Sequence, residues 1–113
     1  SCVDHLNNFH SLPSKEFLKA LDEIEQLMSK YISMVSDAIS SSSFKNIDKI
    51  TEQHDALIAL INKTMDHVIG EIQEGDIGNR IGQLQMKLLL ETRDILITVQ
   101  NMYSLYHDYH KQN

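Results

Sequence analysis

The chain has little of what stabilises small disulfide-rich or zinc-dependent domains. Its 113 residues include a single cysteine, Cys2, which excludes an intrachain disulfide and a CxxC zinc motif. One cysteine is compatible with a reducing, cytosol-like compartment. Proline occurs once, glycine four times and tryptophan not at all. Because proline and glycine interrupt regular elements, their scarcity favours long uninterrupted ones.

Positive charge and long apolar runs are scarce as well. The sequence has ten Lys and Arg residues and 16 Asp and Glu residues, which gives a formal net charge of −6. An acidic chain attracts neither polyphosphate nor anionic lipid, which argues against nucleic acid and membrane surfaces as partners. No apolar run approaches the ~20 residues that span a bilayer. The opening SCVDHLNNFH lacks the basic start and apolar core of a signal peptide. Because the chain does not begin with Met, we expect it to be part of a longer protein.

Three long segments, about 14–42, 44–74 and 76–110, carry apolar residues at alternating steps of three and four. This spacing is typical of amphipathic helices. We call the apolar stripe expected to face the core the seam of each helix. The first seam contains Phe17, Leu21, Ile24, Met28, Tyr31, Val35 and Ala38. The second contains Ile47, Ile50, His54, Leu57, Ile61, Thr64, Val68 and Ile72. The third contains Ile77, Ile81, Leu84, Leu88, Glu91, Ile95, Val99, Met102, Tyr106 and Tyr109.

Capping residues predict where these helices begin and end. Ser14 can cap the first helix, and the serine run at 40–43 ends it because serine hydroxyls compete with helical hydrogen bonds. Gly75 can adopt the left-handed conformation that closes the second helix. Asp76 is a suitable N-cap for the third, where its charge complements the helix dipole.

Long helices joined by short loops pack as antiparallel neighbours. We therefore predict an all-α, up-down antiparallel bundle of three long helices in a single domain, residues 1–113. The second and third helices are apolar around a wide arc, so three helices alone would leave apolar surface exposed. We expect a fourth element to cover it, either residues 1–10 as the tail of another helix or a second copy of the chain.

The sequence contains no nucleophile elbow, phosphate-binding glycine loop, HExxH or EF-hand loop, and we predict that it is not an enzyme. Carboxylates at helical spacing remain as candidate metal ligands: Glu52 with Asp55, and Glu91 with Asp94. Acids three or four residues apart share a helix face and can hold a hard divalent or ferric cation through oxygen. Solvated helix faces explain the same spacing, and we favour that interpretation because helical acid pairs commonly serve solubility.

A histidine and a carboxylate, His54 and Glu91, lie on predicted seams. A buried ionised carboxylate is costly unless it is paired. Glu91 therefore requires a cation such as Lys63, partial exposure at the seam, or a ligand. His54 is more typical of a hydrogen-bonded histidine at the core or its edge than of a metal ligand.

Three stretches resemble the helical repeat of PhoU-like proteins: ALDEIEQLMSKYISMVSDAI, KNIDKITEQHDALIALINKTMDHVI and LLLETRDILITVQNMYSLY. The opening CVDHLNNFHSLPSKEF resembles a helix junction in the C-terminal cytoplasmic region of PiT-family inorganic phosphate transporters. The resemblance covers nearly the whole chain. It implies a non-catalytic regulatory or interaction domain on the cytosolic side of the inner membrane. Its partners would be the membrane portion of the same permease or its regulators, and we also expect a homo-oligomer.

The chain departs from the PhoU-like metal motif, which spaces its two acids four residues apart. Glu91 and Asp94 are three apart, and Thr98 is not an acid. The iron or zinc clusters of the family are therefore not carried over. Two alternatives stay open: a free-standing metal-binding bundle that uses Glu52, Asp55 and the Glu91–Asp94 pair, and a dimeric helical adaptor unrelated to transport.

Overall fold

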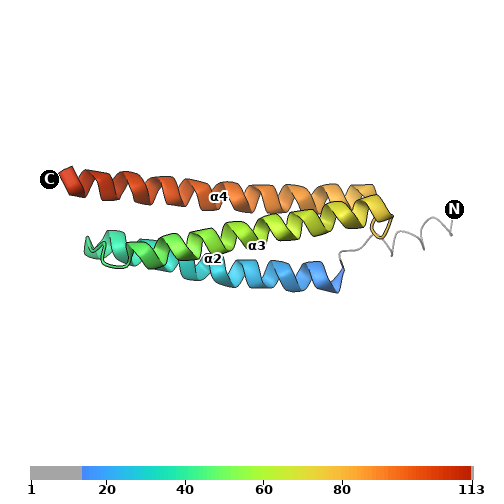
Figure 1. Ribbon diagram of the computed structural model, residues 1–113, viewed down its shortest axis with the longest axis horizontal. Helices are drawn as coiled ribbons and strands as arrows, with labels where there is room; N and C mark the ends of the chain where they lie inside the picture. The colour runs from blue at the N-terminus through green and yellow to red at the C-terminus, as the bar shows by residue number, and fades with distance from the viewer. Residues whose placement is uncertain (1–13, 113) are drawn as a thin grey trace.

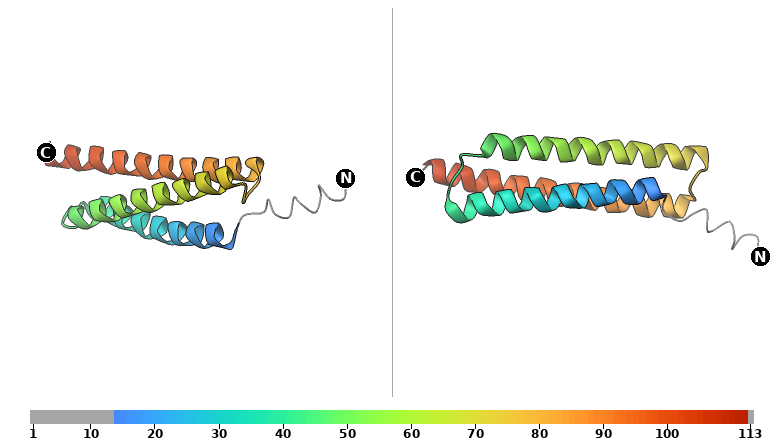
Figure 2. Two further views of the ribbon diagram at one scale, coloured as in Figure 1. Left: turned by 45° about the vertical axis from the view of Figure 1, so that its right-hand side comes forward. Right: turned by 90° about the horizontal axis from the view of Figure 1, so that it is seen from below.

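The computed structural model describes residues 14–112, and these form three helices joined by short loops (Figure 1). Helix α2 spans Lys15–Ser41, α3 spans Ile47–Glu74 and α4 spans Asn79–Gln112. Helices α2 and α4 run in the same direction and α3 runs opposite to both (Figures 1 and 2). The predicted all-α up-down bundle is confirmed. The fourth element that involves residues 1–10 lies outside the described residues.

The ends of α2 and α3 follow the predicted capping residues. The hydroxyl of Ser14 accepts a hydrogen bond of 3.0 Å from the backbone N–H of Phe17. Ser42 and Gly75 both adopt the left-handed conformation, with φ of 52° and 78°, and their backbone N–H groups close α2 and α3. The prediction for Asp76 is wrong, since α4 begins at Asn79 and Asp76 lies in the connecting loop.

The seams predicted for α2 and α3 form most of the core. Their buried members are Phe17, Ile24, Met28, Tyr31, Val35 and Ala38 on α2, and Ile50, Leu57, Ile61, Thr64 and Val68 on α3. The heptad spacing therefore identifies the buried face of each of these two helices.

The predicted seam of the last helix is wrong for most of α4, although Ile77 in the preceding loop is buried and Val99 packs partly buried against the core. The residues of α4 that the bundle buries are Gly82, Gln85, Leu89, Leu96 and Tyr103. Leu88 and Leu89 are consecutive and point about 100° apart on a helix. The prediction chose the stripe through Leu88, whereas the bundle buries the stripe through Leu89. Both stripes are apolar, so spacing alone could not distinguish them.

Helix α3 packs extensively against both neighbours, whereas α2 and α4 contact each other much less. Gly82 permits close packing of α4 on α3: a Cβ atom there would collide with the side chain of Ile72. The cross-section is thus an open triangle whose α2–α4 side is only partly closed. None of the described helices has a stretch long and apolar enough to cross a membrane.

Two glycines of this fold give a matched pair for stability measurements. Gly70 lies within α3 with nothing near the position of a Cβ atom, so Gly70→Ala is expected to stabilise the chain by about 0.5–1 kcal/mol. Gly75 has φ of 78°, so Gly75→Ala is expected to cost about 1–2 kcal/mol. Urea unfolding followed by circular dichroism measures both. Destabilisation by Gly70→Ala would contradict the open space beside Gly70.

Candidate interaction surface

The candidate metal ligands do not converge in this bundle. Glu52 and Asp55 are exposed on α3, and Glu91 and Asp94 are exposed on α4. Glu91 is two positions after buried Leu89, so it lies about 200° around the helix from the core. Across residues 14–112, no group of three or more His, Cys, Asp or Glu side chains is arranged to hold a metal ion.

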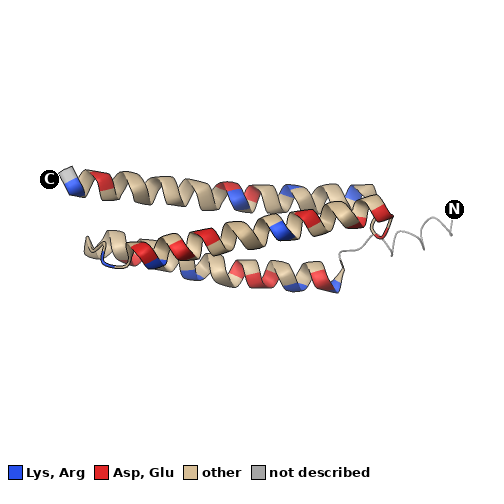
Figure 3. Cartoon of the chain, viewed as in Figure 1, with Lys and Arg blue, Asp and Glu red and all other residues tan. Residues whose placement is uncertain are grey.

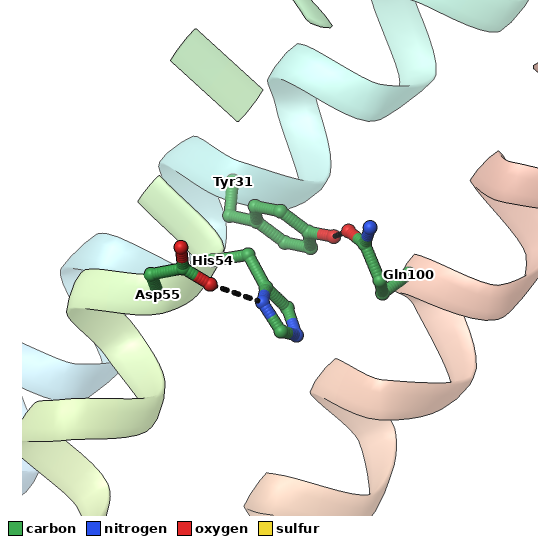
Figure 4. Close-up of polar contacts among 4 residues, drawn as sticks. All are labelled: Tyr31, His54, Asp55 and Gln100. Carbon is green, nitrogen blue, oxygen red and sulfur yellow. Dashed lines mark hydrogen bonds and ion pairs between the residues drawn. The ribbon is translucent and has the colours of Figure 1, made fainter. Parts of the chain in front are cut away.

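Of His54 and Glu91, which were both expected on a seam, only His54 approaches the core. Its side chain is 18% exposed, and its Nδ1 lies 3.3 Å from Oδ1 of Asp55 (Figure 4). The His54 ring packs near Tyr31 with ring centroids 6.0 Å apart. Glu91 is exposed, which removes the need for a buried partner and corrects the expectation that it interrupts the core.

A partly buried polar contact that the sequence analysis missed joins α2 to α4. The hydroxyl of Tyr31 donates a hydrogen bond of 2.6 Å to Oε1 of Gln100 (Figure 4). Tyr31 has no exposed surface, and Tyr103 lies nearby with its hydroxyl buried and without a hydrogen-bond partner in the described structure. The sequence did contain a sign of this contact, namely the glutamine within a mostly apolar stretch of the last helix. Its partner became visible only once the correct face of α4 was known.

This contact predicts a dependence of stability on alkaline pH. Burial, and then the neighbouring Tyr103, raise the pKa of Tyr31 to about 12. In the unfolded chain tyrosine titrates near pH 10. Because the folded pKa is the higher one, the stabilisation is complete below about pH 10 and is lost as pH rises through 12. From Tyr31 alone, the free energy of unfolding should fall by about 2–3 kcal/mol between these pH values.

Urea unfolding at each pH measures this slope, and Tyr31→Phe is the control because it lacks the titrating hydroxyl. The slope of the variant should be shallower than that of the wild type. An unchanged slope would assign the alkaline destabilisation to other groups.

An apolar groove lies on the open side of the bundle, between α2 and α4. It has a volume of about 400 Å³. Leu21, Ile24, Met28 and Ile32 of α2 line it together with Leu88 of α4, and Glu25, Ser29 and Thr92 complete the lining. The groove exists because α2 and α4 each pack against α3 more extensively than against each other.

Beside this groove, α4 exposes a row of large apolar side chains that we call the α4 stripe. The stripe consists of Leu84, Leu88, Ile95, Met102 and Leu105, whose exposed fractions lie between 41% and 71%. Leu88 belongs to both the groove and the stripe, so the two form one continuous surface. Residues 95–107 of α4 contain no Lys, Arg, Asp or Glu (Figure 3). Contiguous exposed apolar surface of this kind marks a site of contact with another molecule.

Four of the five stripe residues, Leu84, Leu88, Ile95 and Met102, belong to the seam that the sequence analysis had assigned to the core, whereas Leu105 does not. These four were identified correctly as part of an amphipathic row, but the row faces away from the core. Comparisons with protein-family models, with curated proteins and with solved structures found no match to this chain.

Proposed function

We propose that this chain is a non-catalytic helical domain that acts by binding, as a regulatory or interaction domain of a PiT-type inorganic phosphate permease. The proposal draws its link to phosphate transport from the resemblance of the three helical stretches and the HLNNF–LP junction to PhoU-like and PiT-family sequences. On this proposal the domain lies on the cytosolic side of the inner membrane. It contacts the membrane portion of the same permease or a regulator of it.

One feature supports the binding role more than any other: α4 carries two apolar faces, and the bundle buries only one of them. Leu89 and Leu96 have no exposed surface, whereas Leu88 and Ile95, one position earlier, are 41% and 53% exposed. A helix with two apolar faces is expected to have the second one covered by a partner when the bundle covers only the first. The stripe therefore serves contact with another molecule.

The proposal is tested first by the reading frame that encodes the chain, which should specify membrane-spanning segments upstream in the same frame. It is then tested by uptake of radiolabelled phosphate in cells that express the permease with Leu88→Glu or Ile95→Lys. These variants disturb the exposed stripe and leave the core intact, so uptake or its regulation should change while the amount of protein does not. Lys49→Glu, an exposed substitution on α3, is the control. A reading frame without membrane spans would reject the link to transport.

A further inference from the structure

We propose that the partner of the α4 stripe is a second copy of this chain, with the two α4 helices packed antiparallel about a two-fold axis between residues 96 and 97. The inference rests on the binding role proposed above and specifies the partner for the same surface. It is carried by the spacing of the stripe and by the charges beside it.

The stripe has the period of a coiled-coil contact. Leu84, Leu88, Ile95, Met102 and Leu105, with Glu91 and Thr98 between them, follow one another at alternating steps of four and three. This 3.5-residue repeat keeps a straight row of side chains facing a partner helix. The buried face of α4 has its own heptad row one position later, through Leu89, Leu96 and Tyr103. Helix α4 therefore carries two heptad rows, and the bundle buries only the row through Leu89, Leu96 and Tyr103.

An antiparallel pairing places apolar residues opposite one another at both ends of the contact. Leu88 lies opposite Leu105 of the partner subunit, and by symmetry Leu105 lies opposite Leu88 of the partner subunit. Near the axis, Ile95 lies opposite Thr98 of the partner subunit. Glu91 lies opposite Met102 of the partner subunit, so no layer of this arrangement sets two carboxylates against each other.

Charges along the outer edge of the stripe complement each other in the same arrangement. Lys87 lies opposite Asp108 of the partner subunit, and Asp94 opposite Asn101 of the partner subunit. All four residues are exposed on α4. Each pair occurs twice because of the two-fold axis, which gives two ion pairs and two amide–carboxylate contacts.

The same charges disfavour the neighbouring arrangements. A shift by one heptad in one direction sets Asp94 against Asp94 of the partner subunit, and a shift in the other direction sets it against Asp108 of the partner subunit. An in-register parallel pair would set Glu91 against Glu91 of the partner subunit within the contact. Like charges at close range discriminate strongly between partners and registers. The chain's own charge pattern thus selects one of the four arrangements.

The area available predicts a dimer of modest affinity. About half of each stripe side chain is exposed, and large side chains carry roughly 200 Å² each, so two copies would remove on the order of 1,000 Å² from water. That area is at the lower limit for a specific interface. Glu91, whose carboxylate must lose part of its hydration opposite Met102 of the partner subunit, limits the affinity further.

Sedimentation velocity of the 113-residue chain across the micromolar range tests the proposal. We expect a concentration-dependent equilibrium between monomer and dimer. Leu88→Glu should weaken dimerisation at least tenfold, and Glu91→Leu should strengthen it about tenfold. Lys49→Glu on the exposed surface of α3 should leave it unchanged. Because the substituted side chains are exposed in the bundle, circular dichroism should show native helix content in every variant.

A charge swap tests the pairing of Lys87 with Asp108 of the partner subunit. Lys87→Glu and Asp108→Lys should each weaken the dimer about threefold to tenfold, and the double variant should recover most of the loss. Additive weakening in the double variant would overturn this register.

Disulfide cross-linking tests the orientation in a Cys2→Ser background. A mixture of the Leu88→Cys and Leu105→Cys variants should cross-link, whereas each variant alone should not. Cross-linking of Leu88→Cys with itself would overturn the antiparallel arrangement. A chain that stays monomeric at about 100 µM would overturn the dimer altogether. That result would be separate from failure of the proposed function, since the upstream reading frame is determined without reference to self-association.

Discussion

Leu96→Ala is expected to lower the free energy of unfolding by about 2–5 kcal/mol, the largest effect of any single substitution described for this chain. Leu96 has no exposed surface and belongs to the buried core of the bundle. Truncation to alanine removes apolar area from the core and leaves a cavity that neighbouring side chains fill only in part. Urea unfolding followed by circular dichroism measures the loss.

Ile95→Ala is the matched control, since it deletes an apolar side chain of similar size one position earlier on the same helix. Ile95 is 53% exposed, so at concentrations low enough to keep the chain monomeric its truncation should change stability by less than about 0.5 kcal/mol. A loss from Ile95→Ala equal to or above that from Leu96→Ala would mean that α4 packs through the other row. The assignment of the stripe as exposed surface would then be wrong.

Gln85→Leu is expected to raise the stability of the chain by about 1–3 kcal/mol. Gln85 is 4% exposed, and neither its amide oxygen nor its amide nitrogen has a hydrogen-bond partner in the described structure. Replacing an unsatisfied buried amide with an apolar side chain of similar volume removes a desolvation penalty and adds apolar burial. The melting temperature should rise by about 4–8 °C for each kcal/mol.

Gln100→Leu provides the comparison, because Gln100 lies on the same helix but has a partner. Its amide oxygen accepts the hydrogen bond from the hydroxyl of Tyr31, which would lose its acceptor in the variant. We expect a loss of about 1–3 kcal/mol, opposite in sign to the change at Gln85. If both substitutions destabilise the chain equally, Gln85 has a partner in solution.

How well the buried residues of a helix could be predicted depended on how many apolar rows it carries. In α2 and α3 the row predicted from the heptad period is also the row that the bundle buries, so the period identified the buried residues from Phe17 to Val68. In α4 two rows satisfy the same period, and the more continuous one, through Leu88 and Ile95, is the exposed one. The buried row includes Gln85, and the half-buried Gln100 lies beside it, so the buried row is the less apolar of the two. Only the packing of the bundle distinguishes the two rows.

The sequence predicted that an interaction surface exists but not where on the bundle it lies. The wide apolar arc of the second and third helices indicated that something further must cover the bundle. The location required knowing that α3 lies between its neighbours and that α2 and α4 only partly close the third side. The interpretation of Glu91 also depended on which face of α4 is buried. A carboxylate within an apolar row is incompatible with a core, but it is acceptable on a surface that meets a partner only part of the time.

The central position of α3 also determines how the chain folds. Its extensive contacts join α2 to α3 and α3 to α4, which are neighbours along the sequence, and the contact between α2 and α4 is the smaller one. Two helical hairpins that share one helix can each form without bringing distant segments together. Chains with such local contacts fold within microseconds to milliseconds. A newly made chain would therefore fold before it meets another molecule, so association takes place between folded bundles.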